Sequence, residues 1–141
     1  MRKLFISDQL NLSPDQVKLI AEFIVFCENH LPIQGGYTVK IVGQRDPHGI
    51  STTASYMVGG NECRVYAKSR ALVDVLRSVA HEMTHMMQDE KGMIDGPVQD
   101  AGGFHEYQAN AKAGELIKLF AKSSPERHRI YERKLISGRI L

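Results

Sequence analysis

The stretch ALVDVLRSVAHEMTHMMQDE, residues 71–90, has the period of one amphipathic helix and sets the organisation of the whole chain. Its large apolar residues recur every three or four positions, which on a helix places them in a stripe about 120° wide. The stripe consists of Leu72, Leu76, Val79, Met83, Met86 and Met87. His81 and His85 fall on the far side of the helix from this stripe. The stretch therefore predicts a helix from Ala71 to about Glu90 that packs on one face and carries two histidines on the other.

The two histidines and the glutamate between them have the spacing of a metal site. His81 and His85 are one helical turn apart, so both imidazoles can bind one ion at the Zn–N distance of about 2.0–2.1 Å. Glu82 is rotated about 60° from His85, which is too far for a ligand but close enough to reach a water on the metal. The HExxH order thus supplies two ligands and one base. The alternative interpretation is that these are three polar residues on the solvent-exposed side of an ordinary helix.

A catalytic zinc site needs a third protein ligand, because two histidines alone bind the ion poorly. The downstream candidates are Asp95, Asp100, His105 and Glu106. The two aspartates fall in a predicted loop, where a ligand would be loosely held. Glu106 begins a predicted helix, and Ala109 and Ala113 on the same face would let that helix approach the first one closely. Asn110 could then hydrogen-bond a ligand. Glu106 is therefore the preferred third ligand, with a plain first-turn glutamate favoured by the helix dipole as the alternative.

Further helices and strands are predicted on either side of residues 71–90. Ser13-Pro14 begins a helix that runs to about His30. Strands are predicted at Tyr37–Val42, Ser51–Val58 and Glu62–Ala67, the last two joined as a hairpin by Gly59-Gly60-Asn61. A helix at Phe104–Ala121 and another from Ser124 to about Ile136 complete the pattern. The order predicts an α+β fold, a single domain over residues 1–141, with a three-stranded sheet and helices against one side.

Two segments together resemble a known family. VLRSVAHEMTHMMQ, residues 75–88, followed by FHEYQANAKAGELI, residues 104–117, resembles the small gluzincin metallopeptidases, in which HExxH lies on one helix and a glutamate on the next. The resemblance implies a minimal zincin-like domain and a zinc metalloendopeptidase. It also implies that His81, His85 and Glu106 bind one zinc ion and that Glu82 is the general base. In such peptidases the substrate lies along an edge strand, and either Ser51–Val58 or Glu62–Ala67 could supply that edge.

The residue that stabilises the developing oxyanion is left open by the sequence. A peptidase usually has a Tyr, His or Arg donor near the metal. The candidates are His105, Tyr107, His128 and Tyr131. The main alternative function is a non-catalytic domain of the same fold that keeps zinc for stability, although a structural site would have no use for Glu82 as a base.

Composition limits the remaining classes of function. The chain has 141 residues and a net charge of +2, which is too small to indicate a nucleic-acid partner. No apolar run approaches the length of about 18 residues that a membrane span requires. Cys27 and Cys63 are in apolar surroundings without a CxxC pattern, so both are expected to be buried free thiols. We therefore expect a cytoplasmic protein. The resemblance to metallopeptidases implies a peptide or protein substrate as its partner, with a protein that presents the substrate as a further candidate.

Overall fold

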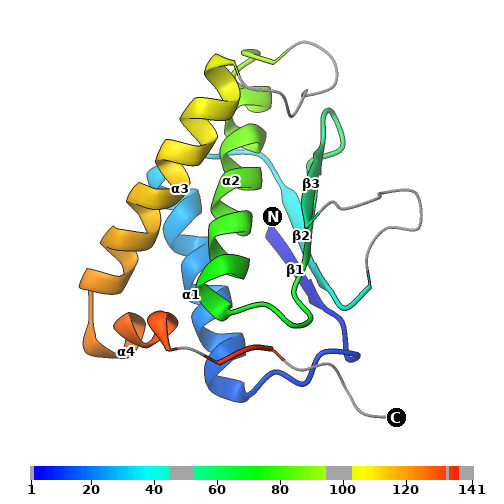
Figure 1. Cartoon of the computed structure of the whole chain (residues 1–141). Helices are drawn as coiled ribbons and strands as arrows, with labels where there is room; N and C mark the ends of the chain where they lie inside the picture. The colour runs from blue at the N-terminus through cyan, green and yellow to red at the C-terminus, as the bar shows by residue number, and fades with distance from the viewer. Residues whose placement is uncertain (1, 45–52, 95–102, 133, 137–141) are drawn as a thin grey trace.

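A four-stranded mixed sheet with helices on one of its faces makes up the described part of the chain (Figure 1). The computed structural model describes residues 2–44, 53–94, 103–132 and 134–136. The elements in chain order are β1 (Arg2–Ile6), α1 (Pro14–His30), β2 (Tyr37–Val42), β3 (Ala54–Met57), β4 (Glu62–Tyr66), α2 (Leu72–Glu90), α3 (Phe104–Lys122), α4 (Pro125–His128) and the 3-10 helix η1 (Arg129–Tyr131). The predicted α+β class is confirmed.

The sheet has one strand more than the sequence predicted. Its order is β1-β2-β4-β3, with β1, β2 and β4 parallel and β3 antiparallel to β4. The prediction of three strands was wrong because β1 is short. In it only Leu4 and Ile6 are partly buried against the core. A parallel strand also needs a long crossover, here the one that contains α1, so its pairing with β2 has no local sequence signal.

The β3–β4 hairpin is confirmed, and it decides which predicted strand lies at the edge. Gly59 and Asn61 in the connecting turn have positive φ angles of 81° and 51°, which glycine and asparagine adopt more readily than other residues. β4 pairs on both sides, with β2 and with β3. Of these two predicted strands, β3 therefore lies at an edge of the sheet, and β1 lies at the opposite edge. Residues 51 and 52 of the predicted strand lie outside the described part.

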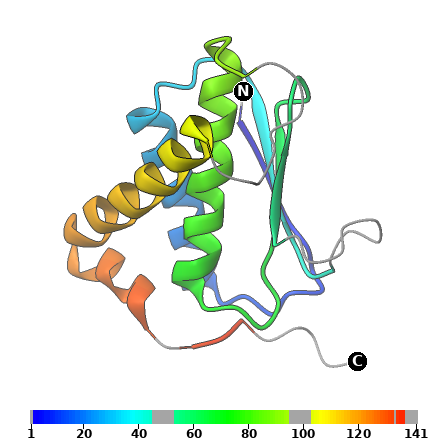
Figure 2. The ribbon, with the colours of Figure 1, turned by 45° about the horizontal axis from the view of Figure 1, so that its top comes forward.

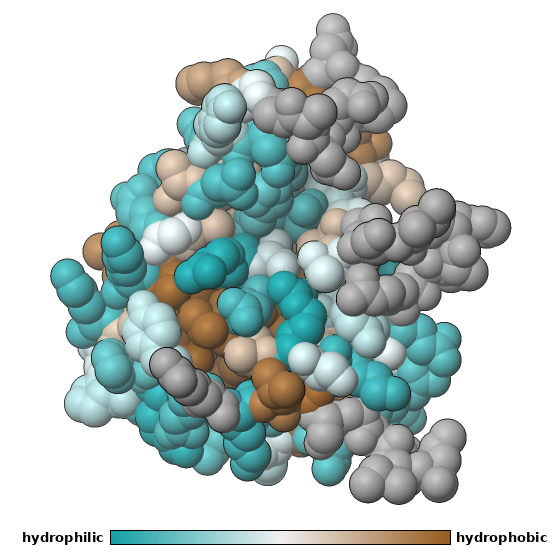
Figure 3. Space-filling view, viewed as in Figure 1, coloured by the Kyte–Doolittle hydropathy of each residue, from teal (hydrophilic) through white to brown (hydrophobic). Residues whose placement is uncertain are grey.

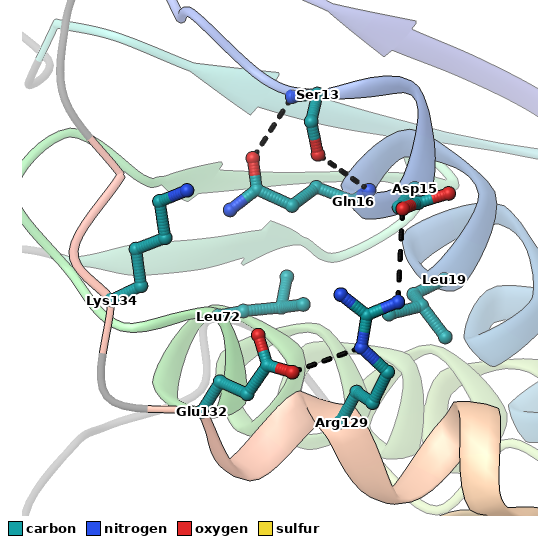
Figure 4. A pocket seen from close by; sticks show the side chains of 8 residues that line it. All are labelled: Ser13, Asp15, Gln16, Leu19, Leu72, Arg129, Glu132 and Lys134. Carbon is teal, nitrogen blue, oxygen red and sulfur yellow. Dashed lines mark hydrogen bonds and ion pairs between the residues drawn. The ribbon is translucent and has the colours of Figure 1, made fainter.

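The first turn of α1 is formed as the sequence predicted. Ser13 Oγ accepts a hydrogen bond from Gln16 N at 3.2 Å, and Gln16 Oε1 accepts one from Ser13 N at 3.0 Å, which is a complete capping box. A pocket of about 210 Å³ opens beside this turn (Figure 4). Arg129 on its other wall lies 3.7 Å from Asp15 and 2.9 Å from Glu132. The pair with Asp15, which is largely exposed, thus attaches the C-terminal segment to the start of α1.

The predicted last helix is shorter than expected. It was predicted to run to about Ile136, but α4 ends at His128 and η1 at Tyr131. The chain then continues towards an isolated bridge between Leu135 and Ala71. Ile136 N donates to Arg70 O at 2.8 Å, and its buried side chain joins the core. An extended end satisfies the backbone just before α2, which a continued helix would not do.

Helix α2 lies between the sheet and α3 (Figure 2). The predicted apolar stripe from Leu72 to Met87 is buried. The opposite side is not exposed to solvent, however, since α3 covers it and leaves His85 only 3% exposed and Gln88 fully buried. Nearly the whole circumference of the second half of α2 is therefore internal. The outer surface of the molecule in the view of Figure 3 is, by contrast, mostly hydrophilic.

Both cysteines are buried, as predicted. The core also contains an edge-to-face ring pair between Phe23 of α1 and Phe120 of α3, with ring centroids 5.0 Å apart. Among the helices of the described residues, none has the length and apolar character to cross a membrane.

Candidate metal centre

Two adjacent helices bring together the three side chains that the sequence singled out as metal ligands. His81 and His85 project from α2 towards α3, and their Nε2 atoms are 3.2 Å apart. Glu106, in the first turn of α3, places Oε1 2.8 Å from His81 Nε2 and Oε2 3.1 Å from His85 Nε2. Ala109 and Ala113 are buried at this face of α3, and their small side chains permit the close approach. The three residues form a group that could hold a metal ion.

The spacing and chemistry of these donor atoms fit a divalent transition-metal ion. In a tetrahedral complex with bonds of about 2.0–2.2 Å, neighbouring ligand atoms are separated by roughly 3.3 Å. The two imidazole nitrogens are 3.2 Å apart, which is close to this value. Each lies 2.8 or 3.1 Å from a different oxygen of the Glu106 carboxylate, and with one ligand atom per residue the three atoms lie within 4.8 Å of one another. Two imidazole nitrogens and one carboxylate oxygen suit zinc, and nitrogen and oxygen donors also suit other first-row ions. Three protein ligands leave one position for a water or a substrate.

The surroundings of His81 favour the neutral imidazole that a metal requires. Burial lowers the pKa of His81 below its ordinary value, and this effect is larger than the opposing attraction of Glu106. The neighbouring His85 lowers the pKa further, while a hydrogen bond with Asn110 raises it. Asn110, the residue expected to support a ligand, thus acts on His81. A neutral histidine keeps a lone pair for the ion.

Gln88 is a fourth member of this site that sequence reasoning did not identify. Its side chain is fully buried beside His85, and its Oε1 lies 2.8 Å from His85 Nδ1. Its Nε2 donates to the backbone oxygen of His105 at 3.0 Å and to Gln108 Oε1 at 2.8 Å. A glutamine three residues after His85 lies on the same helical face, and this spacing was the only available signal.

Glu82 is not one of the three converging side chains. It is buried, with 7% of its surface exposed. The pKa of the Cys63 thiol on β4 is raised well above its ordinary value, first by burial and then by the negative charge of Glu82. The charge of Glu82 therefore acts on a residue of β4. Its assignment as a general base stays a prediction.

The other candidate residues do not join the three side chains. The side chain of His105 is half-buried, and its Nδ1 is buried without a hydrogen-bond partner in the described structure. Tyr107 is 69% exposed. His128 and Tyr131 contact each other beyond the far end of α3, about 28 Å of helix from its first turn. Asp95 and Asp100 lie outside the described residues.

Comparisons with protein-family models, with curated proteins and with solved structures found no match for this chain. The assignment of these residues as a candidate metal site therefore depends on their geometry in this structure.

Proposed function

We propose that the protein is a zinc-dependent metallopeptidase with a minimal zincin-like domain. In this proposal His81, His85 and Glu106 bind one zinc ion, and Glu82 is the general base. The observation that supports it best is the convergence of three donor atoms from the HExxH helix and the helix that follows it. The order of residues along α2 adds a carboxylate directly after the first ligand, which a purely structural site would not need.

Each group has a definite part in peptide hydrolysis. A bound zinc ion polarises a carbonyl group and lowers the pKa of a bound water to about 7. Glu82 accepts the proton of the attacking water and passes it to the leaving amine. Because Glu82 is buried, little bulk water competes for this proton.

The free edge of β3 gives an extended peptide a place to bind. A peptide can add to such an edge through backbone hydrogen bonds, as in other cases of strand addition. The β3–β4 hairpin is attached to the last turn of α2, because Asp89 Oδ2 accepts hydrogen bonds from Tyr56 OH at 2.6 Å and from Gly59 N at 2.8 Å. This attachment fixes the edge relative to His85 and His81, one and two turns earlier on α2. The proposed partner is therefore a peptide or an extended segment of a protein, free or presented by another protein.

The test combines metal content with peptide cleavage. Wild-type protein and the variants Glu82→Gln, Glu106→Ala and Glu115→Ala are purified without added metal and analysed by mass spectrometry. Each is then incubated with a mixed peptide library, and new N-termini are counted. Glu115 is the matched control because it lies on α3 with its side chain 55% exposed and away from the site.

We expect one zinc per chain in the wild type, in Glu82→Gln and in the control, and a large loss in Glu106→Ala. Cleavage is expected only for the wild type and the control. Zinc retained in Glu106→Ala would refute the ligand set, and cleavage by Glu82→Gln would refute the assigned base. Zinc without any cleavage would favour a non-catalytic zinc domain.

A further inference from the structure

We propose that Gln88 is a positioning residue that fixes the tautomer of His85 and aligns α3 with α2, so that His85 and Glu106 reach the same metal ion. This inference rests on the proposed metal site. It concerns a residue outside the HExxH motif and outside the ligand set.

The contacts of Gln88 determine the direction of its side-chain amide. The nitrogen and oxygen of a glutamine amide are distinguished by their hydrogen-bond partners. The backbone oxygen of His105 can only accept, so the group 3.0 Å from it must be the Gln88 nitrogen. The Gln88 oxygen is then the atom 2.8 Å from His85 Nδ1.

That direction determines where His85 carries its proton. A carbonyl oxygen can only accept, so Nδ1 of His85 is the donor in this contact. A neutral imidazole protonated at Nδ1 has its lone pair on Nε2. Nε2 is the atom that lies 3.2 Å from His81 Nε2 and 3.1 Å from Glu106 Oε2. Gln88 thus selects the tautomer of His85 whose free nitrogen faces the other two ligands.

The same amide connects the two helices that carry the ligands. Its two hydrogens are donated to residues 105 and 108, which flank Glu106 in the first turns of α3. Gln88 is fully buried, so water cannot easily replace a lost partner. A glutamate or aspartate at this position would accept from His85 but could not donate to the His105 oxygen. The position therefore requires an amide, with an acceptor at one end and donors at the other.

The two histidines differ in their need for such support. The side chain of His81 is 18% exposed, while that of His85 is 4% exposed. Water can solvate the ring of His81, whereas the ring of His85 depends on its protein partner. A change at Gln88 should therefore act on metal binding mainly through His85.

The experiment compares Gln88→Leu with Gln108→Leu, which removes a partner of the amide without touching His85. Zinc affinity is measured by competition with a chelator, and the ring nitrogens of His85 are observed by ¹⁵N NMR in the zinc-loaded protein. We expect Gln88→Leu to bind zinc about 10–100-fold more weakly, the usual effect of losing such a partner. Gln108→Leu keeps the bonds of Gln88 to His85 and to the His105 oxygen, so its loss of zinc affinity should be smaller than that of Gln88→Leu. The hydrogen-bonded Nδ1–H signal of His85 should be present in the wild type and in Gln108→Leu and absent in Gln88→Leu.

Folded Gln88→Leu protein with zinc affinity within about threefold of the wild type would overturn the inference. So would a wild-type spectrum in which zinc is bound at Nδ1 of His85, and this measurement decides the question even if Gln88→Leu does not fold. Failure of zinc to bind the wild type would overturn the proposed function and this inference together. Zinc binding without peptide cleavage would remove the peptidase activity alone and leave the test of Gln88 intact.

Discussion

The carboxylate of Asp89 joins the last turn of α2 to the β3–β4 hairpin, and its removal should measurably loosen the hairpin. Oδ2 accepts from Tyr56 OH at 2.6 Å and from Gly59 N at 2.8 Å. A hydrogen bond to a charged group contributes about 1.5–3 kcal/mol, and partial exposure of Asp89 favours the lower end of that range. The loss of both bonds in Asp89→Ala should lower the free energy of unfolding by about 2–4 kcal/mol. For a chain of this size, that corresponds to a fall in Tm of roughly 8–16 °C.

Thermal unfolding followed by circular dichroism measures this change, with Glu115→Ala as the control. Glu115 makes one exposed ion pair with Lys112 at 3.5 Å, which contributes about 0–0.5 kcal/mol. Hydrogen exchange at the Gly59 amide gives a local measure, and we expect faster exchange in Asp89→Ala. If this variant unfolds within about 2 °C of the control and the Gly59 amide keeps its wild-type protection, the hairpin is not held by Asp89 and our reasoning about the edge strand is wrong.

Three further predictions concern the stability of the fold. Ser13→Ala should lower the free energy of unfolding by about 1 kcal/mol in urea, because it removes the acceptor of the capping box, whereas Ser13→Asp should not. Phe120→Ala should cost about 3–5 kcal/mol, since it leaves a cavity beside Phe23, and a loss below about 1 kcal/mol would mean that the core collapses around it. Hydrogen bonding with Arg2 lowers the pKa of Glu28 from its ordinary value of 4.5, so its stabilisation is complete above that value and is lost as the pH falls through the lower, folded-state pKa. Glu28→Gln should therefore be less stable than the wild type at pH 7, by up to about 1 kcal/mol. The difference should shrink as the pH falls through the folded-state pKa of Glu28, and a difference that is unchanged in acid would contradict this.

The elements that could be predicted from the sequence are those with local signals. Helix α1 begins after Ser13 because its capping box and Pro14 lie within four consecutive residues. Helix α2 follows from the period of its apolar stripe. The β3–β4 hairpin follows from Gly59 and its neighbours, because a tight turn needs residues that tolerate positive φ.

The errors concern contacts between distant parts of the chain. β1 pairs with β2 across a helix, and nothing near Arg2–Ile6 marks that partner. The predicted end of the last helix was wrong because Ile136 pairs with the backbone of Arg70, some 66 residues earlier, and local patterns do not record this contact.

The candidate site likewise has some features with a local sequence signal and others that depend on contacts between distant residues. HExxH is a local pattern, and the small residues after Glu106 indicated that its helix could approach closely. The burial of His85 by α3 and the role of Gln88 depend on how two helices pack. Glutamine has many uses in proteins, and its partners become apparent only when that packing is known.

The three converging side chains belong to two helices that are consecutive along the chain, and His85 and Glu106 are only 21 residues apart. An ion bound to them would close a short loop and leave β1, α1 and β2 outside it. Closing a loop of this size costs little entropy, and contacts between near neighbours in sequence form early in folding. In pulse-labelled exchange with zinc present, amides of α2 and α3 should gain protection before those of β1 and β2. Metal uptake would then depend on the pairing of two helices, and it could precede completion of the parallel sheet.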